Sequence, residues 1–156
     1  MKFTIPIPLQ QEHAALHERL HSATLEPGAV GAAARELARL MHPHFVKEDE
    51  IALPPLGLLA ALAERQVDED MEAVLVLTDR LEADLPQMLQ EHKAIVVALQ
   101  ALRAAAELAE RTEVVAFADD LIQHARTEEE VMYPAAVLVG RHVRLALAQR
   151  GRAESA

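Results

Sequence analysis

The chain has no cysteine and no tryptophan among its 156 residues, and aromatic residues make up only 3% of it. Without cysteine it can form neither a disulfide nor a thiolate metal site, and catalysis by a thiol is excluded. Histidine remains as a candidate metal ligand, and the sequence contains 8 histidines.

Basic residues are also scarce relative to acidic ones, and the formal net charge is −10. Nucleic acid is not an expected partner, because phosphate binding needs a basic face. No uninterrupted run of about 18 apolar residues is present, so we expect no membrane span. The opening "MKFTIPIPLQ" has two prolines and lacks the apolar segment of a secretory signal. We therefore expect a cytoplasmic protein.

The residues that are abundant favour helix. Hydrophobic residues account for 51% of the chain, and alanine, leucine, glutamate and arginine dominate it, with few β-branched clusters. The length suits one domain with a sizeable core. The sequence thus predicts an all-α fold: an extended N-terminal arm over 1–8, a four-helix bundle over 9–149 and a flexible tail over 150–156.

Turn and breaker residues divide the bundle into four helices. We expect them over about 9–25, 29–52, 68–109 and 112–149, with a short apolar piece, "LLAALAER", between the second and the third. Pro43, Pro86 and Pro134 fall inside these ranges and predict kinks or local irregularities.

The buried face of the last predicted helix contains polar residues at positions where leucine would be expected. Helical spacing of three and four places eight residues on that face. They are Val114, Phe117, Leu121, His124, Glu128, Val131, Ala135 and Leu138. The second predicted helix repeats the pattern with His44 and Glu48. A carboxylate inside a bundle is costly unless a partner compensates its charge.

The chain is internally duplicated. "HFVKEDEIALP" starts at His44 and "HARTEEEVMYP" at His124, 80 residues later, while "QEHAALHERL" and "QEHKAIVVAL" start at Gln11 and Gln90, 79 residues apart. Each half is therefore a helical hairpin with one His on its first helix and His-x-x-x-Glu on its second. This predicts an up-down bundle built from two duplicated hairpins.

Together the two hairpins bring six candidate metal ligands to one level of the core. They are His13, His44, Glu48, His92, His124 and Glu128. Residues four apart share one helix face, so each His-x-x-x-Glu pair can serve a common centre. Four imidazoles with two carboxylates suit Fe, Mn, Zn or Co. Six donors are too many for one tetrahedral zinc, and they suit two metals that share the carboxylates as bridges.

Other polar residues have smaller expected roles. His17, one turn after His13, is a candidate seventh ligand. Glu12 and Glu91 each precede a candidate histidine and are candidate acceptors for a ring N–H. Tyr133, the only tyrosine, is expected to pack at the end of the bundle. Four further residues are expected to face solvent: His21, His42, Asp49 and Glu129.

These motifs resemble the haemerythrin-like (HHE cation-binding) family. The resemblance is carried by "EHAALHERL", "HPHFVKEDEIALPPL", "QEHKAIVVAL" and "HARTEEEVMYP" and spans nearly the whole chain. It implies a four-helix bundle with a non-haem di-iron centre of two Fe ions, with Mn or Zn as candidate substitutes. It implies that Glu48 and Glu128 bridge the two metals. His13, His44, His92 and His124 then become terminal ligands.

The chain departs from the oxygen-carrying haemerythrins at two places. Those proteins have two histidines one turn apart on the third helix, whereas Met88 and Val96 flank His92 here. Their last helix bridges with an aspartate one place later, where this chain has Glu129. Either His17 or water would complete the coordination. The ligand set is similar to that of bacterial relatives linked to oxygen, nitric oxide, peroxide or iron handling.

The leading functional hypothesis is a di-iron protein that binds or senses dioxygen or a related small oxidant, with a candidate redox partner. The alternatives are an enzyme that processes peroxide or nitric oxide, an iron-donating or iron-handling protein, and a purely structural bundle. In the metal-free chain, repulsion between Glu48 and Glu128 is expected to push one of them toward protonation.

Overall fold

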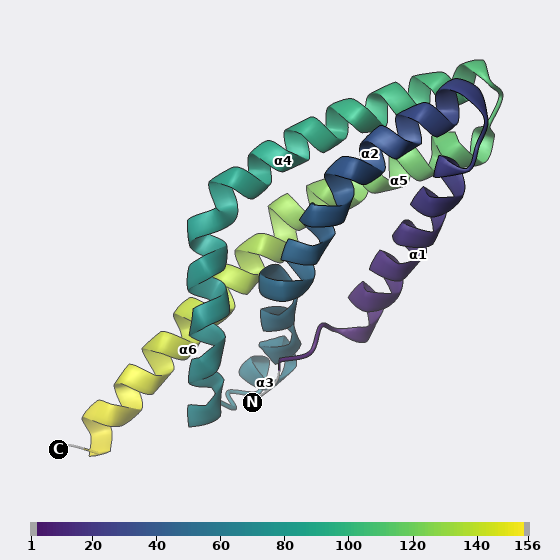
Figure 1. Ribbon diagram of the computed structural model, residues 1–156. Coiled ribbons are helices and arrows are strands. Elements are labelled where there is room, and N and C mark those ends of the chain that lie inside the picture. Colours follow the sequence, from purple (N-terminus) through teal and green to yellow (C-terminus); the bar gives the residue numbers. More distant parts are fainter. Residues whose placement is uncertain (1–2, 155–156) are drawn as a thin grey trace.

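The computed structural model describes residues 3–154 and forms an antiparallel four-helix bundle (Figure 1). Its long helices are α1 (Ile7–Thr24), α2 (Gly28–Lys47), α4 (Val74–Leu108), α5 (Thr112–Thr127) and α6 (Tyr133–Glu154). Helices α5 and α6 follow one another as the fourth helix of the bundle, and no strand occurs within residues 3–154. The prediction of an all-α up-down bundle is confirmed.

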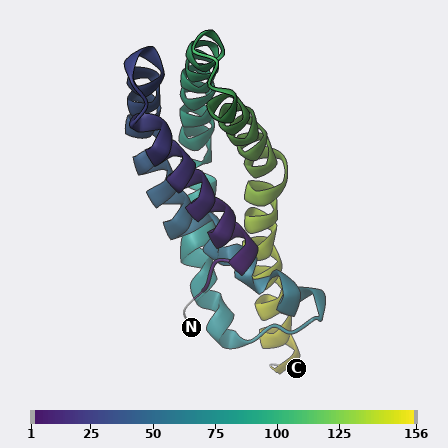
Figure 2. The same cartoon turned by 90° about the vertical axis from the view of Figure 1, so that its right-hand side faces the viewer.

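The two hairpins stand beside each other (Figure 2). Helix α1 packs on α2, α2 on α4, α4 on α5 and α5 on α1, so the four helices enclose one core. The turns α1–α2 and α4–α5 lie at the same end of the bundle (Figure 1). A crossover at the other end joins the hairpins through 3₁₀ turns at Pro54–Leu58 and Glu69–Ala73, with the short helix α3 (Leu59–Ala63) between them.

The ends of the bundle differ from the sequence-based boundaries. Helix α1 begins at Ile7, two residues before the expected start. Pro8 occupies an early helical position, where the backbone N–H makes no intrahelical hydrogen bond, so the proline costs the helix nothing there. Helix α6 continues to Glu154, so residues 150–154 are helical rather than a loose tail. Arg152 lies in its last turn, where a cation favours the helix dipole.

Both hairpins contain a π turn where the sequence has its repeated phrase. The π turns are Glu48–Ala52 and Glu128–Met132. The N–H of Leu53 donates to the Glu48 carbonyl at 3.0 Å, five residues back, and the N–H of Tyr133 donates to the Glu128 carbonyl in the same way.

A proline follows each of these turns and explains it. Pro54 and Pro134 have no N–H for the carbonyl four residues back, and their rings would clash with that carbonyl. Widening the preceding turn relieves the clash, and π turns of this kind are frequent at functional sites. The irregularity expected at Pro134 therefore exists as a π turn just before it.

The π turn shifts the buried face of the last helix by one residue. Val131 and Leu138, which α-helical spacing places inside, are 58% and 61% exposed, whereas Met132 and Val139 are buried. The expected inward positions beyond Glu128 are therefore wrong at these two residues. A π turn takes one extra residue, and every later side chain is rotated accordingly.

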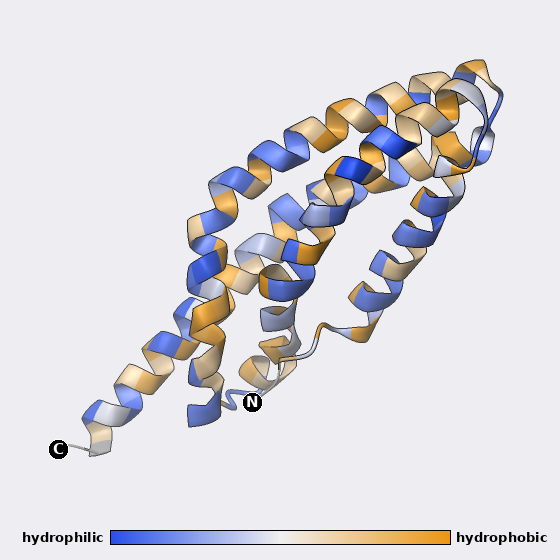
Figure 3. Ribbon diagram, in the orientation of Figure 1, coloured by the Kyte–Doolittle hydropathy of each residue, from blue (hydrophilic) through white to orange (hydrophobic). Residues whose placement is uncertain are grey.

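Apolar side chains pack above and below the level of the six candidate ligands. One cluster, toward the α1–α2 turn, includes Leu37, Leu99 and Leu121, and a second includes Leu53 and Met88. The ribbon coloured by hydropathy shows apolar residues recurring along each helix between polar ones (Figure 3). The candidate ligands lie between residues of these two clusters in the four helices of the bundle, so they are enclosed by apolar packing.

The helical run Thr112–Ala153 is long and apolar enough, by length and composition alone, to cross a membrane. The expectation of no membrane span rested on uninterrupted apolar runs, and this run is apolar only on average. A core helix of a bundle meets the same test, and this run contains the buried His124 and Glu128. It is therefore weak evidence for a membrane.

Candidate metal centre

All six predicted ligands are buried, and the structure brings them together. Their exposed fractions range from 0% for Glu48 to 5% for His124. They form two groups of ligand atoms that share Glu128. The first group is His44, Glu48, His92 and Glu128, and the second is His13, His124 and Glu128.

In the first group, two imidazoles face two carboxylate oxygens. His44 Nε2 lies 3.1 Å from Glu48 Oε1, and His92 Nε2 lies 3.3 Å from Glu128 Oε2. The His44 and His92 rings lie side by side, with centroids 4.6 Å apart. Because the four donors come from α2, α4 and the two π turns, this group exists only in the folded bundle.

In the second group, His13 from α1 meets His124 from α5. Their Nε2 atoms are 3.2 Å apart. Glu128 Oε1 lies 2.8 Å from His124 Nε2 and 3.5 Å from His13 Nε2. Glu48 Oε2 approaches His13 Nε2 to 4.0 Å.

Each buried carboxylate therefore presents one oxygen to each group. Glu48 directs Oε1 toward His44 and Oε2 toward His13. Glu128 directs Oε2 toward His92 and Oε1 toward His124. This is the arrangement that a carboxylate needs in order to bridge two metal ions.

The residues present fit a pair of metal ions. Metal–nitrogen and metal–oxygen bonds of about 2.1 Å place neighbouring donors of one ion about 3.0–3.4 Å apart. The separations inside each group, from 2.8 to 3.5 Å between the closest donors, match this spacing. Among the described residues, three buried side-chain atoms have no hydrogen-bond partner: His13 Nδ1, Glu48 Oε2 and Glu128 Oε1. Two of them are carboxylate oxygens of this site, as expected of atoms that bind a metal.

A carboxylate lies against the outer nitrogen of every one of the four histidines. The Nδ1 distances are 3.4 Å for His13–Asp49, 2.8 Å for His44–Glu91, 2.9 Å for His92–Glu129 and 3.1 Å for His124–Glu12. The contacts of His44 with Glu91 and of His92 with Glu129 are hydrogen bonds, which hold the ring in place and make its other nitrogen a better ligand. Lys47 also binds Glu91, at 2.7 Å, and so positions it.

For two of these outer carboxylates, the role expected from the sequence was wrong. Asp49 and Glu129 were expected only to face solvent, yet their carboxylates reach His13 and His92. Glu12 and Glu91 do contact ring nitrogens, as expected. Their partners, however, belong to the other hairpin rather than being their sequence neighbours.

Replacing Glu129 by glutamine should weaken metal binding without removing a ligand. The amide cannot accept the His92 Nδ1–H as strongly as a carboxylate does, and such changes typically lower metal affinity by about 10- to 100-fold. The measurement is iron affinity by competition with a chelator. Glu130→Gln, on the exposed neighbour in the same π turn, is the matched control and should leave the affinity unchanged. Equal affinities for the two variants would show that the Glu129 contact is incidental.

Tyr133 is also part of the site, which the sequence analysis did not predict. Its side chain is buried, and its hydroxyl donates a hydrogen bond to Glu48. The same oxygen lies 3.1 Å from His92 Nε2 and 3.5 Å from His44 Nε2. In an α-helix, Tyr133 would lie about 140° around from Glu128, five residues earlier. The π turn returns it to the same face.

His17 is not in either group of donors. Its side chain lies on the outer side of Phe45, with ring centroids 4.1 Å apart. It lines a shallow surface pocket with His21 and His42, both exposed as expected. The structure therefore does not bring the candidate seventh ligand to the centre.

In the metal-free site, protonated histidines balance the charge of the buried carboxylates. Burial lowers the pKa of His92, but hydrogen bonds to Glu128 and Glu48 outweigh this effect and raise it to about 10. Burial also lowers the pKa of His124, and its contacts with Glu128 and Glu12 raise it to about 9. The protonated imidazoles thus supply the positive charge that a metal would otherwise bring.

This charge balance keeps Glu128 ionised, so Glu128 is not the carboxylate that shifts toward protonation. Burial raises the pKa of its carboxyl, but the imidazoles of His124, His13 and His92 beside it reverse that effect and hold the pKa well below its usual range. The expectation left out the histidines that contact Glu128. Histidines in contact with Glu128 dominate instead.

The metal-free protein should lose stability as pH rises above neutrality. The folded-state pKa values of His92 and His124, about 10 and about 9, exceed the ordinary value of 6.5, so the folded chain binds more protons than the unfolded one. Their contribution is complete below pH 6.5 and is lost as pH rises through about 9 to 10. Thermal unfolding of the chelator-treated protein across this range measures it. A melting temperature that holds or rises would contradict the assignment.

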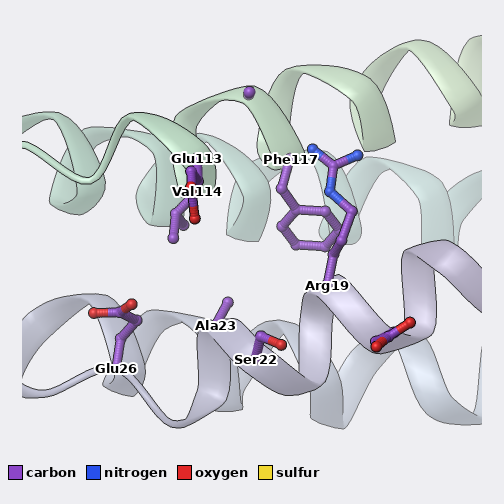
Figure 4. A pocket seen from close by; sticks show the side chains of 9 residues that line it. Arg19, Ser22, Ala23, Glu26, Glu113, Val114 and Phe117 are labelled. Carbon is purple, nitrogen blue, oxygen red and sulfur yellow. The ribbon is translucent and has the colours of Figure 1, made fainter.

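The groove between α1 and α5 in Figure 4 lies apart from the candidate centre. Its lining includes Glu26, Glu113 and Phe117, and Arg19 lies over the Phe117 ring while its guanidinium pairs with Asp120 at 2.7 Å. None of the six candidate ligands lines it. This groove is therefore separate from the buried His–Glu cluster.

Comparisons with known proteins agree with this cluster. The family model described as "Hemerythrin HHE cation binding domain" matches residues 8–136, and a second match covers residues 83–150. Neither the curated proteins nor the solved structures give a match. The family match covers most of the chain, including all six buried ligand candidates. The chain therefore belongs to the haemerythrin HHE cation-binding family, and its buried histidines and glutamates are those of a metal-binding domain.

Proposed function

We propose that this chain is a non-haem di-iron protein that binds or senses dioxygen or a related small oxidant. The observation that carries the proposal is the double-sided placement of Glu48 and Glu128. Each carboxylate directs one oxygen to the His44–His92 pair and the other to the His13–His124 pair. A single-metal site has no need of this arrangement.

The side chains of this chain would hold and tune the metals. Glu48 and Glu128 would be shared between the two metals, and the four histidines would bind them through Nε2, since their Nδ1 atoms are directed at the outer carboxylates. Ferrous iron supplies the electrons that an oxidant takes up. Packed residues such as Phe45 and Met88 keep bulk water from the centre, which strengthens its internal electrostatics.

The test is oxygen addition to protein loaded anaerobically with ferrous iron. The proposal predicts an oxygen-dependent absorption change whose amplitude saturates at a fixed ratio of oxidant to protein. Zinc-loaded protein is the control, because zinc has no redox chemistry and should give no change. Iron-loaded protein that shows no absorption change on exposure to oxygen would count against the proposal.

A second candidate function is turnover of peroxide or nitric oxide at the same centre. It is favoured by a surface groove between α4 and α5 with His92 in its wall, beside Val96, Arg126 and Glu129. This groove brings a small solute close to a predicted ligand. Steady-state consumption of hydrogen peroxide, compared with the same concentration of free iron, tests it. A rate no faster than that of free iron would exclude this candidate.

A further inference from the structure

Tyr133 breaks the symmetry of the duplicated site. Its hydroxyl contacts Glu48 Oε1, His92 Nε2 and His44 Nε2, all in the first group of donors. With this oxygen, the first group has five donor atoms. The second group has four: His13 Nε2, His124 Nε2, Glu48 Oε2 and Glu128 Oε1.

The equivalent residue of the other hairpin is Leu53. Leu53 and Tyr133 each follow a π turn directly, and each donates its N–H to the carbonyl of the buried glutamate. Both are buried, at 0% and 1% exposure. The duplication that relates the two donor groups thus places a phenol beside one and an aliphatic side chain beside the other.

Hydrogen bonding follows the same asymmetry. Glu48 Oε1, in the first group, accepts from Tyr133. The carboxylate oxygens without a hydrogen-bond partner among the described residues, Glu48 Oε2 and Glu128 Oε1, both face the second group.

We propose that Tyr133 is a ligand of the metal held by His44 and His92, so that the two metals of the centre are inequivalent. The inference rests on the proposed di-iron function. The phenol O–H bond breaks as the oxygen–metal bond forms, and the proton leaves to solvent, so one extra proton is released per chain on metal binding. Phenolate oxygen is a hard donor, as are the two bridging carboxylates, and suits ferric iron.

The single tyrosine makes the test unambiguous, because the chain contains one Tyr and no Trp. The diferric wild-type protein should show a phenolate-to-iron charge-transfer band in the visible and, on excitation in that band, Raman-enhanced phenolate ring vibrations. Tyr133→Phe should lose both signals while keeping the apolar ring packing. Its affinity for one of the two irons should fall at least about tenfold.

Mössbauer spectra of iron-57 protein provide a second readout. The wild type should give two distinct ferric doublets of equal area, and Tyr133→Phe should bring them closer together. If Tyr133 served only for packing, Tyr133→Phe would have the same spectra as the wild type and would release the same number of protons on metal binding.

The outcomes separate this inference from the proposed function. Wild-type protein with two irons and no phenolate signal overturns the tyrosine ligand and leaves the di-iron proposal standing. Wild-type protein that binds no iron overturns both. If Tyr133→Phe does not fold, the wild-type Raman spectrum decides alone, because no other tyrosine can produce a phenolate signal.

Discussion

Replacing Glu128 by alanine should remove one of the two metals and weaken the other. Glu128 contributes one oxygen to each group of donors, and its two oxygens lie 2.8 Å from His124 Nε2 and 3.3 Å from His92 Nε2. Its loss takes one bridging ligand from each metal. We expect iron content to fall from about two per chain to one or less, with an affinity loss larger than the roughly 10- to 100-fold typical of an outer contact.

The matched control is Glu130→Ala, two residues along the same π turn. Glu130 is exposed and lies outside both donor groups, so its removal should leave iron content unchanged. Elemental analysis of both variants after identical loading and desalting gives the comparison. If Glu128→Ala retains two irons per chain, Glu128 is not a bridge and the account of the site is wrong.

Removing the metal should lower the melting temperature by about 10 °C or more. A ligand present at about a thousand times its dissociation constant stabilises the folded state by about 4 kcal/mol, and in a chain of this size each kcal/mol shifts the melting temperature by roughly 2–4 °C. The metal-free chain retains some compensation, because protonated His92 and His124 neutralise Glu128. That compensation weakens above neutral pH, so the difference should grow there.

The measurement is thermal unfolding of iron-loaded, chelator-treated and reloaded protein. Reloading should restore the original melting temperature, which rules out damage by the chelator. Equal melting temperatures with and without metal would mean that the buried histidines and glutamates compensate one another's charge without a metal. The buried carboxylates would then be structural.

The burial and clustering of the six candidate ligands could be predicted from the sequence, because both residue type and helical period indicate them. Histidine and glutamate at leucine positions are conspicuous, and the α-helical period holds from α1 through to Glu48 on one hairpin and from α4 to Glu128 on the other. The duplication at a spacing of 80 residues also predicted that two hairpins contribute equivalent halves. The family match over residues 8–136 agrees with that interpretation.

Much of what the sequence analysis missed lies at or after a π turn. Tyr133 and Val131 were misplaced because a count at 3.6 residues per turn continues past Glu128, where the helix widens. The signal available in the sequence was a proline, Pro54 or Pro134, six residues after each buried glutamate. Two prolines at the same place in a duplicated phrase indicate a shared local irregularity rather than two unrelated kinks.

The outer carboxylates were only partly predictable for a different reason. Adjacent residues on a helix point about 100° apart, so Glu12 cannot readily contact the His13 ring beside it. It reaches His124 across the helix interface instead, as Glu91 reaches His44. Which side chain lies across an interface depends on the packing of the helices, and helical period alone does not contain that information.

The most direct test of the central claim is the iron content of the purified wild-type protein, measured with its ultraviolet–visible spectrum in air. Two irons per chain, with a near-ultraviolet ligand-to-metal band typical of carboxylate-bridged diferric centres, is the predicted result. One zinc per chain, or no bound metal after loading with iron, would contradict it. The duplicated His–Glu phrase would then form a buried polar network without a di-iron centre.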